Sequence, residues 1–184
     1  MDEEYTIRGL ALSLPFEQRQ LVDFLASHHL KYETDIQAAY GIFDTGDRLL
    51  GCGCCAGNLL KCFAVDKKLR GQNALGALVS KLVENRFQSG ITHLFVVTRP
   101  QNQALFQQCG FFPVAGTETA ILLENQRDGI SRFYRSLFLP DDAGKLCGAV
   151  VMNCNPFTLG HRTLIEYAAA HCQLLHIFVV EEDR

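Results

Sequence analysis

The sequence lacks any excess of positive charge. Its 184 residues include 17 Lys and Arg against 20 Asp and Glu, which gives a formal net charge of -3. It contains no run of basic residues and no aromatic motif of an RNA-binding domain, so we expect no nucleic-acid partner. A phosphate-bearing substrate would have to be held by local hydrogen-bond donors rather than by a broad positive field.

Long hydrophobic segments are missing as well. No stretch approaches the roughly 18 consecutive apolar residues of a membrane-spanning helix. The acidic start of the chain, MDEEY, has neither the basic residues nor the apolar run of a signal peptide. With 48% apolar and 20% charged residues, the composition is typical of a globular protein. We therefore expect a cytoplasmic protein with no membrane partner.

Cysteine, in contrast, is abundant. The sequence has eight, at positions 52, 54, 55, 62, 109, 147, 154 and 172. Most lie inside apolar segments, so we expect buried free thiols rather than the disulfides of a small secreted protein. The C-x-C-C segment at 52–55 would split its thiols between two faces of a strand, and no C-x-x-C pair or close histidine completes four ligands. We predict core thiols and no metal site.

The most informative segment is MNCNPFTLGHR, residues 152–162. It follows a short apolar run at 147–151, typical of a strand, and precedes apolar residues at helical spacing up to residue 172. With a further strand at 174–180, this order predicts one β-α-β unit with a right-handed crossover. The Asn, Thr and His side chains of the turn meet free N–H groups at the helix start, where the helix dipole favours an anion. We interpret the turn as a phosphate-binding site.

The first 125 residues alternate between helical and strand patterns. Apolar periodicity predicts helices at 15–29, 74–87 and 101–109, and strands at 37–43, 48–55, 59–65, 92–98, 111–114 and 119–124. A short predicted helix at 129–139 leads into the breaker-rich segment PDDAG. We place a domain boundary there, with one domain at 1–140, a linker at 141–145 and a second, incomplete domain at 146–184.

The order of elements up to residue 125 resembles the acyl-CoA N-acetyltransferase (GNAT) fold. The segment NQALFQQCGF, residues 102–111, is similar to a pattern of that family. The resemblance implies a mixed, mostly antiparallel sheet flanked by helices, in an α/β protein. It also implies a site for a CoA-like arm, formed by Arg70, Gly71, Gln72, Asn73, Asn102 and Phe106. Phe106 stands where many acetyltransferases carry the tyrosine that protonates the departing thiolate, so we expect a binding site or scaffold rather than an active acetyltransferase.

The polar turn carries a second resemblance. Thr158, Leu159, Gly160 and His161 form the T-x-G-H version of the H-x-G-H signature of nucleotidylyltransferases. The longer string NPFTLGHR, followed by an alanine-rich helix and a strand, resembles citrate lyase ligase. In that family an adenylyl-transfer domain follows an acetyltransferase-like domain, which is the order seen here. We therefore expect one β-α-β unit of a Rossmann-like nucleotidylyltransferase domain after the GNAT-like domain.

This resemblance implies an acid-thiol ligase. Acetate and ATP would give acetyl-adenylate and diphosphate, and the prosthetic thiol of the citrate lyase acyl carrier subunit would then take the acetyl group and release AMP. The implied cofactors are ATP and Mg²⁺. The implied partners are acetate and the acyl carrier subunit with its dephospho-CoA-derived arm.

The resemblance assigns roles to residues of the turn. His161 and Thr158 would be the catalytic pair, bonded to the phosphates. The residues expected to bind ATP are Asn153, Asn155, Pro156, Gly160 and His161. An imidazole beside phosphates has its charged form favoured, so we expect His161 to donate from both ring nitrogens. The sequence offers no ligand cluster for magnesium. We interpret Cys154, inside the turn, as a bystander rather than an acyl relay.

Other functions stay open at this point. The adenylyl-transfer domain of the family is longer than one β-α-β unit, so the resemblance implies a truncated chain that is inactive alone. The first alternative is a free GNAT acyl-CoA N-acetyltransferase, and the second is a non-catalytic module that docks an acyl carrier. A coenzyme A or pantetheine adenylyltransferase shares the T-x-G-H signature, but the acetyltransferase-like first domain argues against it.

Overall fold

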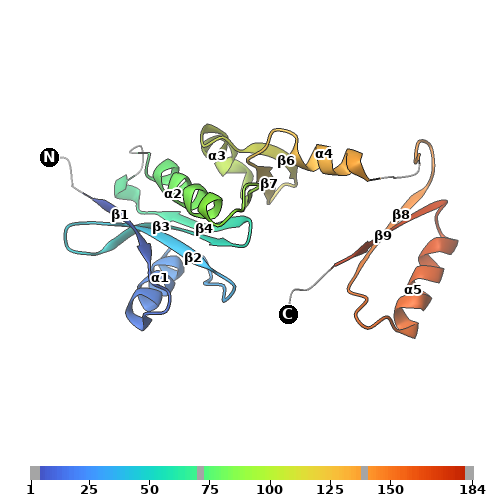
Figure 1. Cartoon of the computed structure of the whole chain (residues 1–184), viewed down its shortest axis with the longest axis horizontal. Helices are drawn as coiled ribbons and strands as arrows, with labels where there is room; N and C mark the ends of the chain where they lie inside the picture. The colour runs from blue at the N-terminus through green and yellow to red at the C-terminus, as the bar shows by residue number, and fades with distance from the viewer. Residues whose placement is uncertain (1–4, 70–72, 138–140, 181–184) are drawn as a thin grey trace. The chain divides into compact units, whose positions relative to one another are not determined.

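The computed structural model describes residues 5–69, 73–137 and 141–180. The chain divides into two compact units, Met1–Tyr134 and Arg135–Arg184, which we call the first and the second unit. Helix α4, Gly129–Ser136, spans the division between them (Figure 1). None of the described helices has the length and hydropathy needed to cross a membrane.

The described part of the first unit is built on a seven-stranded sheet in the order β1-β2-β3-β4-β5-β7-β6. All neighbouring strands are antiparallel except β4 and β5, which are parallel. This is the mixed, mostly antiparallel sheet that the sequence predicts. The strands are β1 Thr6–Leu10, β2 Ala38–Phe43, β3 Leu49–Ala56, β4 Leu59–Val65, β5 Phe95–Thr98, β6 Phe112–Gly116 and β7 Ile121–Glu124.

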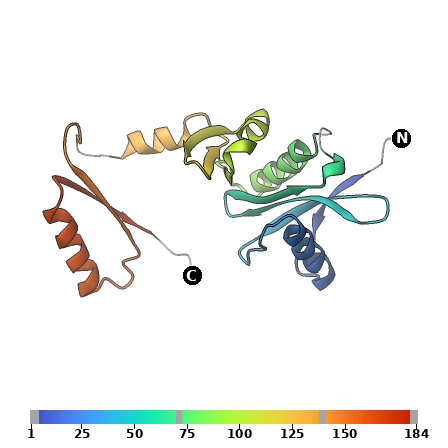
Figure 2. The same cartoon turned by 180° about the vertical axis from the view of Figure 1, so that it is seen from behind.

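Helices α1, Pro15–Ser27, and α2, Ala74–Gln88, cover opposite faces of this sheet, as both views of the ribbon show (Figures 1 and 2). The alternation of side chains along β3 explains why buried clusters lie on both faces of the sheet. Cys52 and Cys54 pack in one buried cluster with Leu21 of α1, whereas Cys55 packs in another with Leu82 of α2. A third helix, α3, Gln103–Gln108, lies along β6.

Most elements lie within a few residues of their predicted positions, but strand β1 was not predicted. Its five residues, TIRGL, pair antiparallel with β2 at the edge of the sheet. A run this short, with Arg and Gly in it, carries too little alternation to be recognised. Arg8 also ties the strand to the rest of the unit through ion pairs with Glu17 at 2.9 Å and Asp47 at 3.1 Å. The end of the helix predicted at 129–139 lies outside the described residues.

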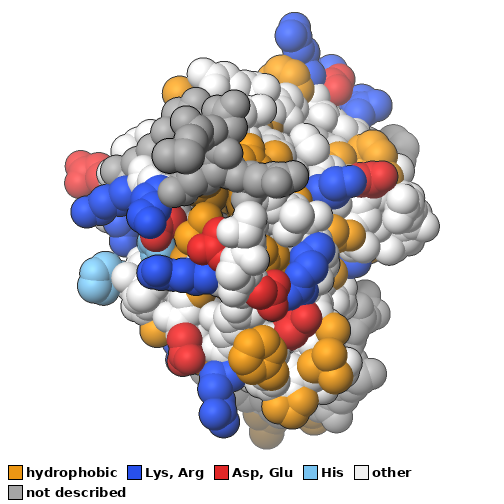
Figure 3. Space-filling model, turned by 90° about the vertical axis from the view of Figure 1, so that its left-hand side faces the viewer, with side chains coloured by type: hydrophobic (Ala, Val, Ile, Leu, Met, Phe, Trp, Pro, Cys, Tyr) orange, Lys and Arg blue, Asp and Glu red, His pale blue; other side chains and the backbone are white. Residues whose placement is uncertain are grey.

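One face of the molecule carries both signs of charge. Figure 3 shows Lys and Arg interspersed with Asp and Glu on one face, with small groups of apolar side chains between them. This pattern agrees with the near-neutral composition and gives that face no single-sign field for a polyanion.

The second unit is a single β-α-β arrangement. Strands β8, Cys147–Met152, and β9, Leu174–Val179, are parallel and in register over six residue pairs, and helix α5, Leu159–Ala170, joins them. Gly148 faces the helix side, because a Cβ built there would lie 2.9 Å from the Cys172 sulfur. The opposite face of the strand is open, and Val151 on it is 68% exposed.

Candidate functional site

The T-x-G-H turn connects the carboxyl end of β8 to the amino end of α5. Thr158 is the N-cap residue of the helix, with extended backbone angles (φ −119°, ψ 167°). The carboxyl edge of parallel strands is where open α/β sheets bind their ligands, because helix starts and loops meet there. The first helical N–H groups have no carbonyl partner within the helix and are directed toward this edge.

Thr158 and His161 form a bonded pair across the first helical turn. The backbone N–H of Thr158 donates to Nδ1 of His161 at 3.0 Å, and the Thr158 hydroxyl lies 2.9 Å from the same nitrogen. The structure therefore brings together the two residues that the motif predicts as catalytic partners. Contacts within the turn therefore hold both side chains in place.

This bond fixes which nitrogen of His161 can face a ligand. A backbone N–H can only donate, so Nδ1 must accept, and the ring hydrogen lies on Nε2. While this bond is present, Nδ1 cannot also donate to a ligand. The prediction that both ring nitrogens donate concerns the phosphate-bound state and stays a prediction. A ring locked in this way offers one directed donor, Nε2–H, to a phosphate oxygen.

The asparagines of the turn have different positions. The side-chain oxygen of Asn153 accepts the backbone N–H of Asn155 at 3.1 Å, so Asn153 shapes the loop. Asn155 is exposed and precedes Pro156 through a cis peptide bond. Asn155 and Pro156 therefore lie on the accessible side of the turn.

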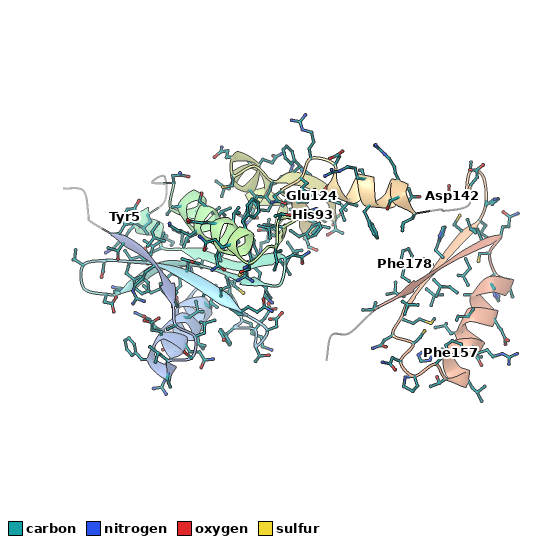
Figure 4. All side chains as sticks on the ribbon, viewed as in Figure 1. Tyr5, His93, Glu124, Asp142, Phe157 and Phe178 are labelled. Carbon is teal, nitrogen blue, oxygen red and sulfur yellow. The ribbon has the colours of Figure 1, made fainter. Side chains whose placement is uncertain are left out.

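Gly160 and Phe157 border the helix start. A Cβ built on Gly160 would meet only the Thr158 hydroxyl, at an ordinary 3.6 Å. No contact within the described part of the chain therefore requires glycine at this position. The remaining reason for a glycine is that a ligand needs the space that a side chain would fill. The Phe157 ring stacks on the His161 ring, with centroids 5.8 Å apart and planes at 29°, and it is exposed at the end of the loop (Figure 4).

Charged groups close to the turn are few. Arg162 bonds to Glu166 one helical turn along α5, at 2.7 Å, and both side chains are exposed. Among the described residues, the one group of three side chains suited to a metal is Asp142, Cys147 and His176, and none of these belongs to the turn. The turn thus offers hydrogen-bond donors for phosphates and no carboxylate set of its own for magnesium.

The predicted CoA-like site of the first unit is only partly described. Arg70, Gly71 and Gln72 lie outside the described residues. Asn73 is the N-cap residue of α2 and adopts a left-handed conformation (φ 55°), which asparagine tolerates. Asn102 donates a hydrogen bond from its amide to the Thr98 hydroxyl at 3.0 Å, so its side chain joins α3 to the end of β5.

Phe106 is part of the hydrophobic core. Its side chain is 2% exposed and makes edge-to-face contacts with Phe63, at 5.2 Å between centroids, and with Phe111, at 6.3 Å. A bound arm could touch this ring only if the core repacked around it. The structure therefore does not present Phe106 as a surface contact, in contrast to the role that the pattern suggested.

The pairing between the central strands β4 and β5 is short. Strands β4 and β5 pair only at Leu59 with Phe95 and at Leu60 with Val96. Beyond Leu60, β4 carries an irregularity at Cys62, whose φ is 55°. The Phe63 ring lies over Gly53 of β3 and beside Leu82 of α2, and it packs edge-to-face on Phe106.

The thiols only partly match the prediction of buried cysteines. Cys52, Cys54 and Cys55 are buried free thiols, as predicted, but Cys147 is exposed. Burial raises the pKa of Cys52 to about 12. A hydrogen bond with Cys62, followed by burial, raises the pKa of Cys54. These core thiols are therefore protonated and unreactive at neutral pH.

Sequence reasoning also missed a polar pair made of a buried carboxylate and a partly buried histidine. Glu124, at the end of β7, is buried and lies 2.5 Å from Nε2 of His93. The same carboxylate accepts the N–H of Ile130 at 3.0 Å, which fixes the start of α4. The two side chains lie together beside that helix (Figure 4). Because 31 residues separate them in sequence, no local pattern could have indicated the pair.

Comparison with known structures supports the fold of the first unit. Escherichia coli ElaA superposes with a TM-score of 0.57, covering 67% of this chain and 100% of that one, at 15% identity. An acyl-CoA N-acyltransferase structure from Klebsiella pneumoniae gives 0.53 at 18% identity, and a GNAT acetyltransferase from Staphylococcus aureus gives 0.55 at 13% identity. These similarities confirm the predicted GNAT-like fold class.

Comparison by sequence reaches the second unit too. The family model described as "Citrate lyase ligase C-terminal domain" matches residues 147–184. A citrate (pro-3S)-lyase ligase from Klebsiella pneumoniae is 44% identical over 168 residues, which are 90% of this chain and 49% of that protein. A protein of the same name from Escherichia coli K12 is 36% identical over 165 residues, 89% of this chain and 47% of that protein. The chain is therefore a homologue of the citrate lyase ligases, and it spans about half the length of the curated relatives that it matches.

Proposed function

We propose that the chain takes part in the ATP-dependent acetylation of a carrier thiol, as an acid-thiol ligase acting on citrate lyase. An oxygen of acetate attacks the α-phosphorus of ATP, a new O–P bond forms, and diphosphate leaves. The carrier thiolate then attacks the acetyl carbon, the C–S bond forms, and AMP leaves with the electron pair of the broken C–O bond. The complete reaction is proposed for a protein of the relatives' length, to which this chain would contribute the GNAT-like unit and the phosphate-binding turn.

The observation that carries this proposal is the bonded pair of Thr158 and His161 at the start of α5. In the proposed complex, Nε2–H of His161 donates to the leaving phosphates, and the Thr158 hydroxyl, which lies 2.9 Å from Nδ1, holds the ring in that orientation. Gly160 lets the nucleotide approach the helix start. Asn155 and Pro156 line the accessible side, and Asn153 holds the loop in shape.

The expected energetics favour a positioning role for these residues. Charge at an exposed helix end is worth about 0.3–1 kcal/mol, whereas correct alignment of two reactants can lower a barrier by about 7–11 kcal/mol. The turn supplies no nucleophile and none is needed, because acetate and the carrier thiol are the nucleophiles. Its contribution is a set of donors fixed before ATP arrives.

Magnesium would be held mainly by the triphosphate itself. Mg²⁺ prefers oxygen ligands and commonly binds through substrate phosphates with few protein ligands. The described residues of the turn present amide, hydroxyl and imidazole groups, which suit phosphate oxygens better than this ion. In the reaction, magnesium would neutralise charge on ATP, and the protein residues would orient the nucleotide.

We further propose the division of the chain into residues 1–140 and 146–184 joined by 141–145. The GNAT-like part would provide the scaffold. Acyl carrier docking is proposed for the complete enzyme, and no contact of Phe106 with the carrier arm is included, because that ring lies in the core.

Titration calorimetry with magnesium-ATP tests the nucleotide site directly. We expect His161→Ala to weaken ATP binding by about 10- to 100-fold, the value of one hydrogen bond to a charged group. His171→Ala, at the other end of α5, is the matched control and should bind as the native chain does. Gly160→Ala should keep the fold and lose affinity. Equal ATP affinity in the His161 and His171 variants would refute the assignment.

A second assay tests the reaction class. The complete enzyme is incubated with ATP, acetate and the deacetylated acyl carrier, and AMP and acetyl thioester are quantified. Both should appear only when all three substrates are present. Turnover of acetyl-CoA with a small amine, without any need for ATP, would instead support the GNAT acetyltransferase alternative.

A further inference from the structure

Three side chains of different chemistry converge in the second unit, away from the T-x-G-H turn. A carboxylate oxygen of Asp142, the sulfur of Cys147 and a ring nitrogen of His176 all lie within 4.8 Å of one another. They come from the segment before β8, from the first residue of β8 and from the middle of β9. The described residues contain no second group of this kind.

The strand register explains why two of the three meet. Cys147 pairs with Leu174, and Ala149 pairs with His176, so Cys147 and His176 lie on the same face of the two parallel strands. That face is the open one, opposite α5. The two side chains are therefore diagonal neighbours, within reach of each other for a residue as long as histidine.

The turn before β8 delivers the third side chain. The Asp141 carboxylate accepts the N–H of Ala143 at 3.1 Å, and the Lys145 N–H donates to the Asp142 carbonyl at 3.0 Å. The Cys147 thiol lies 3.6 Å from the Lys145 carbonyl. These bonds fold residues 141–145 back over the start of the strand, which leaves the Asp142 carboxylate close to Cys147.

We propose that Asp142, Cys147 and His176 bind one divalent transition-metal ion of the zinc type, with water as the fourth ligand. Thiolate, imidazole and carboxylate are the three ligand types that proteins use for zinc. One thiolate and one carboxylate balance the two charges of the ion. The sulfur donor disfavours magnesium and calcium, which prefer oxygen ligands.

The geometry needs only a small adjustment to hold such an ion. Ligand atoms around a tetrahedral zinc, at bond lengths near 2.0–2.3 Å, are about 3.3–3.6 Å apart. The three groups would close by about 1 Å, through side-chain rotation. Asp142 and Cys147 are exposed and His176 is half-buried, so the side chains have room to rotate and the ion has a path from solvent.

The position of the site indicates a structural role. Asp142 and Phe157 mark opposite ends of the β-α-β unit (Figure 4). A bound ion would tie the segment before β8 to β9, far from the helix start that faces ATP in the proposed function. It would thus attach residues 141–145 to β9, which is otherwise held by β8 and α5. The inference does not depend on the proposed reaction.

Cobalt(II) provides a direct probe, because a thiolate ligand gives a charge-transfer absorption that can be seen without any enzyme assay. The 184-residue chain is titrated with Co²⁺, and Zn²⁺ is then added in competition. We expect one equivalent of cobalt to bind with a thiolate band, and zinc to displace it. Cys147→Ser should abolish the band, and Asp142→Asn and His176→Ala should each weaken cobalt binding at least tenfold.

Matched variants separate this site from other thiols and carboxylates. Cys154→Ser, Asp23→Asn and His171→Ala each change a residue of the same type outside the proposed ligand set and should retain the cobalt band. Circular dichroism of every variant checks that the fold is intact, as expected for changes at exposed or half-buried positions. Absence of cobalt binding by the native chain, or persistence of the band in Cys147→Ser, would overturn the proposal.

Discussion

The two units of the chain differ in how completely they bury their apolar residues. In the first unit, three clusters of buried side chains cover both faces of the sheet. Of the described residues in the second unit, Met152 alone is buried, whereas Leu159, Val179 and Phe178 are 79%, 65% and 54% exposed. The first unit therefore has its own core, and the second has a regular backbone with almost no core.

The two units are therefore stabilised in different ways. Burial is worth about 25 cal/mol per Å² of apolar surface, which a seven-stranded sheet between helices can collect and a two-stranded sheet with one helix cannot. The second unit depends on local bonds, such as the pair of Thr158 and His161, and on parallel strand pairing. The candidate ATP site is thus placed on the less stable of the two units.

The largest expected difference is in thiol reactivity. Because burial raises the pKa of Cys52 from 9.0 to about 12, its thiolate fraction near pH 8 should be lower by a factor on the order of 10³. Exposed Cys147 should be alkylated first by iodoacetamide, and Cys52 only after unfolding. Peptide mapping by mass spectrometry measures both rates. Early labelling of Cys52 would mean that the first unit opens far more readily than its core implies.

The next largest effect should follow removal of a core ring. Phe106→Ala is expected to lower the free energy of unfolding of the first unit by about 3–5 kcal/mol, because a buried phenyl group leaves a cavity. Phe178→Ala, on the open face of the second unit, should change the free energy of unfolding of that unit by less than about 0.5 kcal/mol. Urea unfolding followed by circular dichroism gives both values. A similar loss of unfolding free energy in the two variants would show that the two units do not differ in how well their cores are packed.

A smaller effect is expected at the polar pair beside α4. Glu124→Ala removes the acceptor of the Ile130 N–H and the partner of His93, which should cost about 1–3 kcal/mol. Gly129 must stay small there, since a Cβ would collide with the Glu124 carboxylate and the His93 ring. Glu118→Ala, at an exposed position, is the control and should leave the unfolding midpoint unchanged. An unaltered midpoint for Glu124→Ala would show that this contact does not hold the helix.

The smallest effect concerns alkaline pH. Burial alone lowers the pKa of Lys61, but hydrogen bonds to Asp35 and Glu33 outweigh it, so the pKa is raised above 10.5. A raised pKa means that Lys61 stabilises the fold below pH 10.5, and that this contribution disappears as the pH rises through the folded-state value. Unfolding midpoints of the native chain and of Lys61→Met should therefore converge at high pH. A difference between the two unfolding midpoints that stays the same at every pH would contradict this contribution of Lys61.

How much the sequence could predict depended on whether a feature is local. The T-x-G-H turn was predictable, because Thr158 and His161 lie three residues apart and meet within one helical turn. Strand β1 was missed, since its partner residues on β2 lie 29 to 37 positions away and its own pattern is short. Asp142, Cys147 and His176 were missed for the same reason. Phe106 was placed correctly within its element, but its burial depends on Phe63 from another strand.

The burial of Phe106 has a consequence for binding rates. A ligand that had to reach this ring would first have to wait for the packed Phe63 and Phe106 rings to move apart. Its association rate would then stop rising with ligand concentration and would level off at the rate of that opening. A pantetheine-like arm presented to the chain at increasing concentration would reveal such a ceiling, whereas docking on an exposed surface would show none.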